Sequence, residues 1–277
     1  MDGPAEKSLA AAGGTRLFVR DLPVPAARRR GGVVLMHGLG EHCGRYAHLA
    51  RFFNERGWSA RLYDHRGHGR SDGPRGDVPD DQALLRDAKL VLDDFAVGLG
   101  EPPLLFGHSM GGLFAAAFAA AALSPLRGLI LSSPALGLSL TAPQKMLLAS
   151  LGAVTPGLQV SNGLQTRYLS HDPEVVRAYE NDPLVHPKIT PRLLRCMLRT
   201  IDDAHNRAPS LAIPVLMLVA GDDRMVDARG SEAFFARLPP GTGTLHRYPA
   251  FYHEVFNEKD ARRAFGDLAA WMDDRGF

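Results

Sequence analysis

A Gly-x-Ser-x-Gly pattern at residues 107–111, centred on Ser109, is the stretch whose residue types and spacing most directly suggest chemistry. It follows the apolar run 104–106 and precedes the helix-forming run 113–123. Strand, turn and helix in this order are typical of a nucleophile elbow, where flanking glycines let a sharp turn close and the helix N-terminus favours negative charge. A chance match is the alternative in a chain with 29 glycines. Because the expected strand before it and the expected helix after it fit this arrangement, we predict that Ser109 is a nucleophile.

A nucleophilic serine needs a general base, for which histidine is the usual choice. The chain order in a nucleophile-elbow fold is serine, acid, histidine, so of the 11 histidines those near the last strand qualify. His246 lies inside the expected strand 244–248, where its side chain is expected to face the sheet. His253 follows that strand in a loop and is expected to point back at the strand ends. We therefore predict that His253 is the base.

The histidine in turn needs an acidic residue that fixes its tautomer and stabilises the imidazolium. This acid is expected after the strand 215–219, where Asp222 and Asp223 follow closely and Asp227 lies a little further on. Aspartate also suits turns after strands, so the residue that is not the acid is expected to form the turn. Spacing alone leaves Asp222 and Asp223 open.

Two backbone N–H groups are needed to hold the oxyanion of an acyl-transfer reaction. One belongs to the residue after the nucleophile, which is Met110. The other comes from the loop after an early strand, and the glycine-rich residues 37–40 follow the apolar run 32–36. We predict that Leu39 is this donor. His37 is expected to hydrogen bond within the loop rather than to act as a catalytic base.

Residues 64–71 follow the second expected strand and are rich in polar side chains. Asp64, His65 and His68 suggest metal ligands, but nothing elsewhere completes a set with the usual zinc spacing. We therefore predict a polar turn held by side-chain hydrogen bonds, and we expect neither a metal nor a cofactor.

Apolar runs alternate with helical periodicity, which predicts an α/β fold with a mostly parallel sheet and helices on both faces. The predicted strands are 32–36, 58–63, 104–106, 129–131, 215–219 and 244–248, and the predicted helices are 46–56, 81–97, 113–123, 231–237 and 261–272. Between 134 and 210 the patterns are helical, without a strand. Ligands bind at the carboxyl ends of the strands in such sheets. We therefore predict a core of residues 1–133 and 211–277 with a helical cap, residues 134–210, placed as a lid.

Composition and charge exclude several classes of protein. The chain has 277 residues, 45% of them hydrophobic and 22% charged, and its net charge of +2 gives no indication of a nucleic-acid partner. Cys43 and Cys196 match no metal or redox spacing and are expected to be free thiols in a reducing compartment. Residues 1–14 lack the apolar segment of a secretory signal, and no apolar run is long enough to span a membrane. We expect a cytoplasmic protein, at most peripheral to a membrane, of undetermined oligomeric state.

Five motifs stand out when the chain is read as a whole. They are His37-Gly-Leu-Gly-Glu-His-Cys-Gly-Arg-Tyr46, Asp64-His-Arg-Gly-His-Gly-Arg-Ser71, Gly107-His-Ser-Met-Gly-Gly112, Asp223-Arg224 and Tyr252-His-Glu-Val-Phe-Asn257. Together they resemble the α/β-hydrolases, and within them the monoacylglycerol lipase and lysophospholipase-like group of the serine aminopeptidase S33 type. The resemblance runs from about residue 15 to the C-terminus and implies the α/β-hydrolase fold. In this family the acid directly precedes Arg or Lys, which implies Asp223 rather than Asp222.

The resemblance also implies which residues meet the substrate. Glu41 and Arg45 are expected near its polar end, and Tyr179 is expected to reach that end from the cap. The alternative for Glu41 and Arg45 is that they pair with each other and hold the oxyanion loop.

These residues predict hydrolysis of an ester through an acyl-enzyme, and the resemblance implies a monoacylglycerol or a similar medium- or long-chain acyl ester as the substrate. Lysophospholipids and generic carboxylic esters are the alternatives. An enzyme like the proline iminopeptidases would need an acidic group in the cap to hold an ammonium, for which Glu174 and Glu180 are the candidates. A binding protein without turnover is disfavoured because serine, aspartate and histidine are all present.

The expected cap contains an apolar cluster at helical spacing that is too short to span a bilayer. Its members are Met146, Leu147, Leu148, Leu151 and Val154. We interpret the cluster as the wall of an acyl-chain tunnel whose outer lip transiently contacts membranes or micelles. The alternative is a helix that simply packs on the core.

Overall fold

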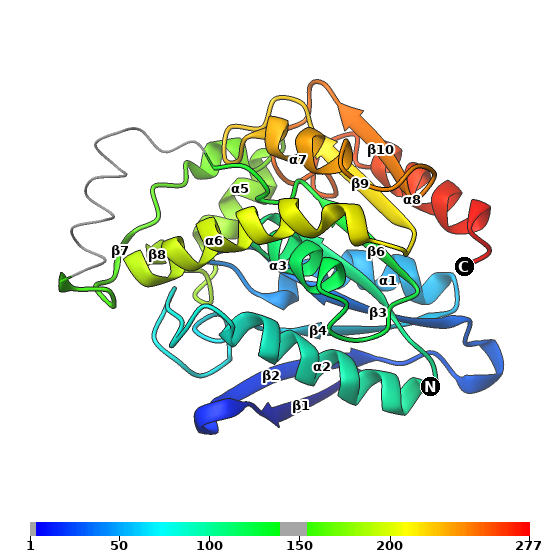
Figure 1. Ribbon diagram of the computed structural model, residues 1–277, viewed down its shortest axis with the longest axis horizontal. Helices are drawn as coiled ribbons and strands as arrows, with labels where there is room; N and C mark the ends of the chain where they lie inside the picture. Colours follow the sequence, from blue (N-terminus) through cyan, green and yellow to red (C-terminus); the bar gives the residue numbers. More distant parts are fainter. Residues whose placement is uncertain (1–3, 139–153) are drawn as a thin grey trace.

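The computed structural model describes residues 4–138 and 154–277 and contains an eight-stranded sheet flanked by helices (Figure 1). The strands, in their order across the sheet, are β1 Ala5–Ala10, β2 Arg16–Leu22, β4 Trp58–Tyr63, β3 Gly31–Met36, β5 Leu104–His108, β6 Gly128–Ser132, β9 Val215–Ala220 and β10 Gly243–Tyr248. Strand β2 pairs antiparallel with β1 and β4, and all other neighbours are parallel. The predicted mostly parallel sheet is therefore present.

Four strands were missed by the sequence patterns. Strands β1 and β2 extend the sheet at one edge, and β1 is exposed along most of its length, so it lacks the apolar alternation that identifies a strand. Strands β7, Val160–Ser161, and β8, Lys188–Ile189, form a small antiparallel pair. The prediction of no strand between 134 and 210 is therefore wrong, because two-residue strands are too short to show a period.

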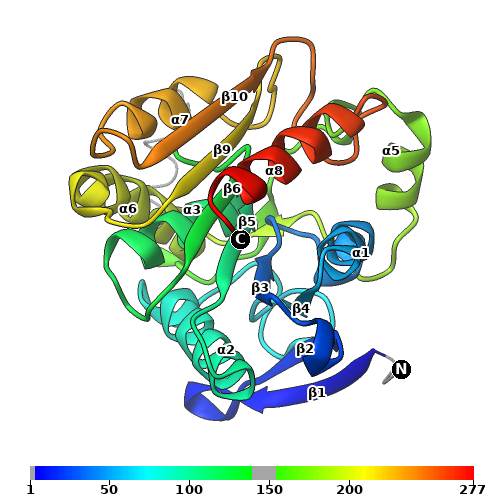
Figure 2. The same ribbon diagram turned by 90° about the vertical axis from the view of Figure 1, so that its right-hand side faces the viewer.

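Helices cover both faces of the sheet (Figure 2). One face carries α2 Ala83–Leu99, α3 Ser109–Ala120, α6 Pro191–Arg207 and α7 Ala228–Phe235, and the other carries α1 Ala47–Glu55 and α8 Arg262–Asp274. Successive strand residues point to opposite faces, which explains the two cores. In β3, for example, Val34 and Met36 pack in one core and Val33 and Leu35 in the other.

The parallel strands bring several loops to one edge of the sheet. Strands β3, β5, β9 and β10 end at residues 36, 108, 220 and 248, and their carboxyl ends lie at the same edge. The short helix α5, Pro173–Glu180, lies between β6 and β9 in the chain. Cys43 and Cys196 are free thiols, as predicted, and both are buried. Within the described residues, no helix combines the length and apolarity needed to cross a membrane.

Candidate active site

The turn between β5 and α3 holds Ser109 in a strained conformation. Its φ of 53° lies in the left-handed region, which costs a non-glycine residue about 1–2 kcal/mol. The turn closes because its neighbours lack side chains. A Cβ on Gly107 would lie 2.5 Å from the carbonyl oxygen of Gly111, and a Cβ on Gly111 would lie 2.4 Å from that of His37. The chain therefore makes the sharp turn between strand and helix that the sequence predicts around Ser109.

His253 and Asp223 form a buried pair at the ends of β10 and β9. The distance between His253 Nδ1 and Asp223 Oδ2 is 2.8 Å, and the two side chains are 4% and 1% exposed. Asp223 Oδ1 accepts hydrogen bonds from the backbone N–H groups of Met225 and Val226, at 2.9 and 3.1 Å. The carboxylate is therefore fixed on one side by backbone donors and aims its other oxygen at the imidazole.

This pairing determines the charges of both groups. Burial opposes protonation of His253, but the Asp223 carboxylate outweighs burial and raises the pKa of His253 above its ordinary value. The imidazole in turn lowers the pKa of Asp223 despite burial of the carboxyl group. Asp223 thus stays ionised and accepts the Nδ1 proton, which leaves Nε2 of the neutral ring free to accept a proton.

The other candidates for acid and base have different surroundings. Asp222 forms an ion pair with Arg224 at 2.6 Å, and both side chains are more than one-third exposed. Asp227 is the N-cap residue of α7. His246 lies within β10, with its Nδ1 3.6 Å from Asp267. Of the two aspartates that spacing left open, Asp223 is the one that contacts His253.

The loop after β3, residues 37–42, packs against the nucleophile turn, and we call it the oxyanion loop. A Cβ on Gly38 would lie 3.2 Å from Ser109 Cβ, so the loop and the serine are in close contact. The N–H of Gly38 donates to Glu41 Oε1 at 2.6 Å and is therefore occupied. Within the described residues the next N–H, that of Leu39, makes no hydrogen bond. Met110 is the second residue of α3, where backbone N–H groups lack a partner in the helix.

The polar residues after β4 form a hydrogen-bonded turn, as predicted. Asp64 accepts hydrogen bonds from the backbone N–H groups of Cys43 and Arg70, both at 2.7 Å. His37 Nε2 accepts from the N–H of His65 at 3.0 Å, so its Nδ1 donates to the Gly38 carbonyl at 2.8 Å. His37 therefore bonds within its own loop through Nδ1, as predicted, and bonds the turn after β4 through Nε2.

Glu41, Arg45 and Tyr179, which the resemblance places near the polar end of the substrate, lie next to one another. The Arg45 guanidinium pairs with Glu41 and lies 4.7 Å from the centre of the Tyr179 ring. Burial opposes ionisation of Glu41, but Arg45 reverses this effect and the pKa of Glu41 is lowered to about 2. Glu41 also holds the oxyanion loop through Gly38, which fits the alternative interpretation of this pair.

Sequence reasoning missed two neighbours of the predicted residues. Glu254, directly after His253, is buried and bound by Arg45. The His108 ring lies 4.7 Å from the His253 ring, centre to centre, and burial together with His253 lowers the pKa of His108 to about 4. The signal available in the sequence was that His108 directly precedes Ser109 and Glu254 directly follows His253.

The segment before β8 docks on the oxyanion loop. His186 donates its backbone N–H to the Gly40 carbonyl at 2.8 Å, and the side chains of His42 and Asp182 meet at 2.8 Å. Gly40 has a φ of +78°, and a Cβ there would lie 2.5 Å from the His186 carbonyl oxygen. Only glycine allows this close approach.

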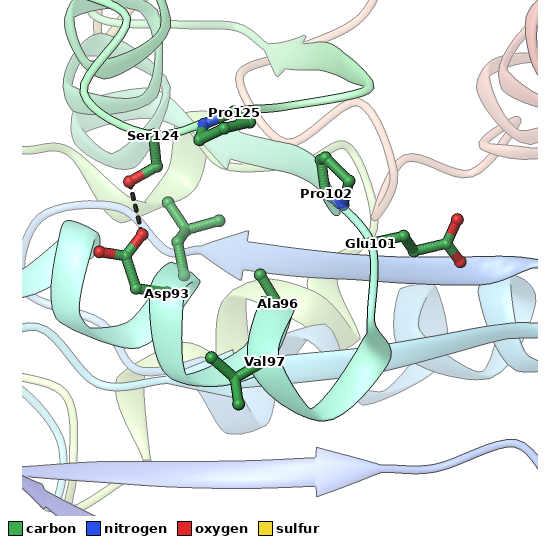
Figure 3. Close-up of a pocket in the computed structure, with 8 residues that line it drawn as sticks. Asp93, Ala96, Val97, Glu101, Pro102, Ser124 and Pro125 are labelled. Carbon is green, nitrogen blue, oxygen red and sulfur yellow. Dashed lines mark hydrogen bonds between the residues drawn. The ribbon is translucent and has the colours of Figure 1, made fainter.

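A pocket of about 280 Å³ lies at the other end of the sheet (Figure 3). Its lining belongs to α2 and to the loops that precede β5 and β6: Leu92, Asp93, Ala96, Val97, Glu101, Pro102, Ser124 and Pro125. Because Ser109 follows the carboxyl end of β5, this pocket is not part of the candidate site.

The chain has a serine on the turn after β5 and a histidine–aspartate pair at the ends of β10 and β9, which is the arrangement found in the α/β-hydrolases. This chain is a serine hydrolase of that fold. Residues 27–260 match the family described as serine aminopeptidase, S33, and the chain belongs to this family.

Three relatives show which kinds of enzyme in this family the chain is similar to. A monoacylglycerol lipase of Mycolicibacterium smegmatis is 36% identical, over 97% of this chain and 96% of its own length. The phospholipase YtpA of Bacillus subtilis is 31% identical, over 87% of this chain and 94% of its own. The crystal structure of a Paleococcus ferrophilus monoacylglycerol lipase superposes with a TM-score of 0.84 at 35% identity, covering 94% of this chain and 99% of that chain.

Proposed function

We propose that this serine hydrolase cleaves monoacylglycerols or similar medium- and long-chain acyl esters. The observation that carries the chemistry is the buried contact between His253 and Asp223 at the sheet edge where Ser109 lies. The substrate class is supported by the relatives, two of which are monoacylglycerol lipases at 35% and 36% identity.

In the proposed mechanism, Ser109 Oγ attacks the ester carbonyl while His253 Nε2 takes the hydroxyl proton. The N–H groups of Leu39 and Met110 hold the resulting oxyanion, each contributing on the order of 3 kcal/mol. The bond to the alcohol breaks as His253 returns the proton to the leaving oxygen. Water then attacks the acyl-enzyme with His253 again as the base, which releases the fatty acid and frees Ser109.

Two details of substrate recognition belong to the same proposal. Helix α6, which belongs to the predicted cap 134–210, packs on a face of the sheet instead, so the cap over the strand ends is formed by the described residues 154–190. In this segment the Tyr179 hydroxyl, which has no hydrogen bond within the described residues, meets the alcohol end of the ester. The alternative peptidase reaction has less support. Glu174 pairs with Arg177, and Glu180 accepts a hydrogen bond from the Thr166 hydroxyl, so both candidate carboxylates already have partners.

The first prediction concerns acyl-chain length. Each buried methylene contributes about 0.8 kcal/mol, so kcat/KM should rise from acetate through medium-chain esters until the acyl site is filled. The measurement is kcat/KM on p-nitrophenyl esters of increasing length, with monoacylglycerols and a lysophospholipid of matched acyl chain for comparison. If acetate is already the best acyl group, the lipase proposal is reduced to a generic esterase. A lysophospholipid preferred over the matched monoacylglycerol would identify the substrate as the phospholipid.

The second prediction concerns contact with lipid surfaces. Four members of the predicted apolar cluster, Met146, Leu147, Leu148 and Leu151, lie outside the described residues. The fifth, Val154, is 80% exposed, and Leu158 and Val160 near it are 47% and 37% exposed. We propose that these three side chains belong to an apolar lip that touches micelles or membranes.

Replacing Val154, Leu158 and Val160 together by serine should therefore lower the rate on micellar monoacylglycerol about tenfold. The rate on a short water-soluble ester should stay within about twofold, because no lipid surface is involved. A Val97→Ser variant, changed at an exposed apolar residue on α2, is the control. Equal losses on both substrates would contradict a role in lipid contact.

A further inference from the structure

The Arg45 guanidinium and the Glu254 carboxylate form a two-pronged ion pair next to the proposed catalytic base. Arg45 Nη1 and Nη2 donate to Glu254 Oε1 and Oε2 at 2.6 and 2.8 Å. The two side chains are 11% and 4% exposed. This parallel fork fixes the orientation of both groups as well as their distance.

The other end of this arrangement reaches the oxyanion loop. Arg45 Nη1 also pairs with Glu41, whose Oε1 accepts the Gly38 N–H and the Tyr46 hydroxyl, each at 2.6 Å. Gly38 precedes the proposed donor Leu39 in the chain. A continuous path of buried polar contacts therefore runs from the residue after His253 to the residue before Leu39.

Backbone contacts hold the Glu254 end in place. The Glu254 N–H donates to the Leu169 carbonyl at 2.9 Å, and Glu254 Oε2 also accepts from the Asn257 side chain at 2.8 Å. A shift of the carboxylate would therefore be transmitted to the loop that carries His253.

Stability alone is a poor explanation for this cluster. Burying an ion pair costs desolvation energy that largely offsets its attraction, and here two carboxylates share one guanidinium. Three of the five N–H donors of Arg45 are engaged by carboxylates, so most of the donating capacity of this guanidinium is used within the cluster. The arrangement suits a group that sets the relative position of two loops.

We propose that Arg45 and Glu254 are positioning residues whose ion pair fixes the oxyanion loop relative to His253. The proposal rests on the catalytic roles proposed above for the oxyanion loop and His253. It assigns Arg45 a positioning role instead of the substrate contact that the resemblance implies.

The cluster also contributes charge. The ionisable groups that face the His253 ring are Asp223 after β9, His108 at the end of β5, Glu41 in the oxyanion loop and the adjacent Glu254. With Asp223 unchanged, loss of the Glu254 charge should favour the neutral imidazole. The pKa of His253 should then fall, so the base stays neutral to a lower pH.

The test compares Glu254→Gln with Glu254→Asp on a short soluble ester. Misplacement of catalytic groups by about 1 Å costs up to about 100-fold, so both variants should lower kcat about 10- to 100-fold with KM changed less than about threefold. Only Glu254→Gln should move the acidic limb of kcat/KM to lower pH, because Glu254→Asp keeps the negative charge and only shortens the side chain by one methylene. Arg45→Lys, which keeps the charge without the fork, should also lower kcat.

The matched control is Asp21→Asn. Asp21 forms a similar fork with the buried Arg61, at 2.7 Å for both bonds, between β2 and β4. This variant should lose thermal stability but keep kcat and the pH profile of the wild type.

Several results would overturn the proposal. Unchanged kcat in folded Glu254 variants would make the pair purely structural, as would unfolding of all three variants when Asp21→Asn folds. A loss confined to KM for glycerol esters, absent for ethyl esters of the same acid, would make the pair a substrate contact. If the proposed function itself is wrong, the wild-type protein will hydrolyse no ester, and this result is distinguishable from the outcomes above.

Discussion

Replacing Ser109 by alanine should lower kcat at least about 10³-fold and leave the fold intact. Without the hydroxyl no acyl-enzyme can form. The turn at φ 53° should be retained, because alanine has the same Cβ as serine and therefore nearly the same backbone preferences. The measurements are kcat on the best ester of the chain-length series and a thermal unfolding curve.

A chemical label provides the independent check. A fluorophosphonate should modify the wild-type protein at Ser109 and fail to modify the alanine variant. Ser124→Ala is the control, because its hydroxyl binds Asp93 at 2.6 Å at the opposite end of the sheet. A label on another residue would refute the assignment of the nucleophile.

Replacing Asp223 by asparagine should lower kcat about 10³- to 10⁴-fold. The structure explains which way the new amide would turn. Because the Oδ1 position faces the N–H groups of Met225 and Val226, the asparagine oxygen should stay there and its NH2 group should face His253. His253 Nδ1 would then accept a hydrogen bond, its Nε2 would carry the proton, and the ring could not accept a proton from Ser109.

Asp222→Asn is the matched control for this prediction. Asp222 pairs with the exposed Arg224, and exposed pairs contribute little, so kcat should change less than about threefold. Steady-state kinetics of both variants on the same ester test the pair of predictions. If the Asp222 variant is the inactive one, the acid is assigned one residue too late.

The sequence allowed prediction of those parts of the site that depend on local geometry. The turn around Ser109 was predictable because Gly107 is required by a local contact, its approach to the carbonyl of Gly111 four residues later. The central strands were predictable because both their faces are buried, and residues 58–63 coincide with β4. Strand β1 was not, because an exposed edge strand carries no such apolar pattern.

The parts that could not be predicted depend on partners far away in the chain. Spacing did not distinguish Asp222 from Asp223, since both follow β9 and their difference lies in which one reaches His253. Beyond its adjacency to His253, Glu254 gave no signal, because its role depends on an arginine 209 residues earlier. The docking of His186 on Gly40 is similarly invisible without the fold.

The long sequence separations also have a consequence during synthesis. The oxyanion loop leaves the ribosome early, yet His42 meets a partner 140 residues later and Arg45 one 209 residues later. At about 5–20 residues per second, the second interval is roughly 10 to 40 seconds. For that time Arg45 has only Glu41, four residues away, as an acidic partner of this cluster. A nascent chain therefore carries residues 107–111 well before it has a functional site, and we expect esterase activity only after Glu254 has been synthesised.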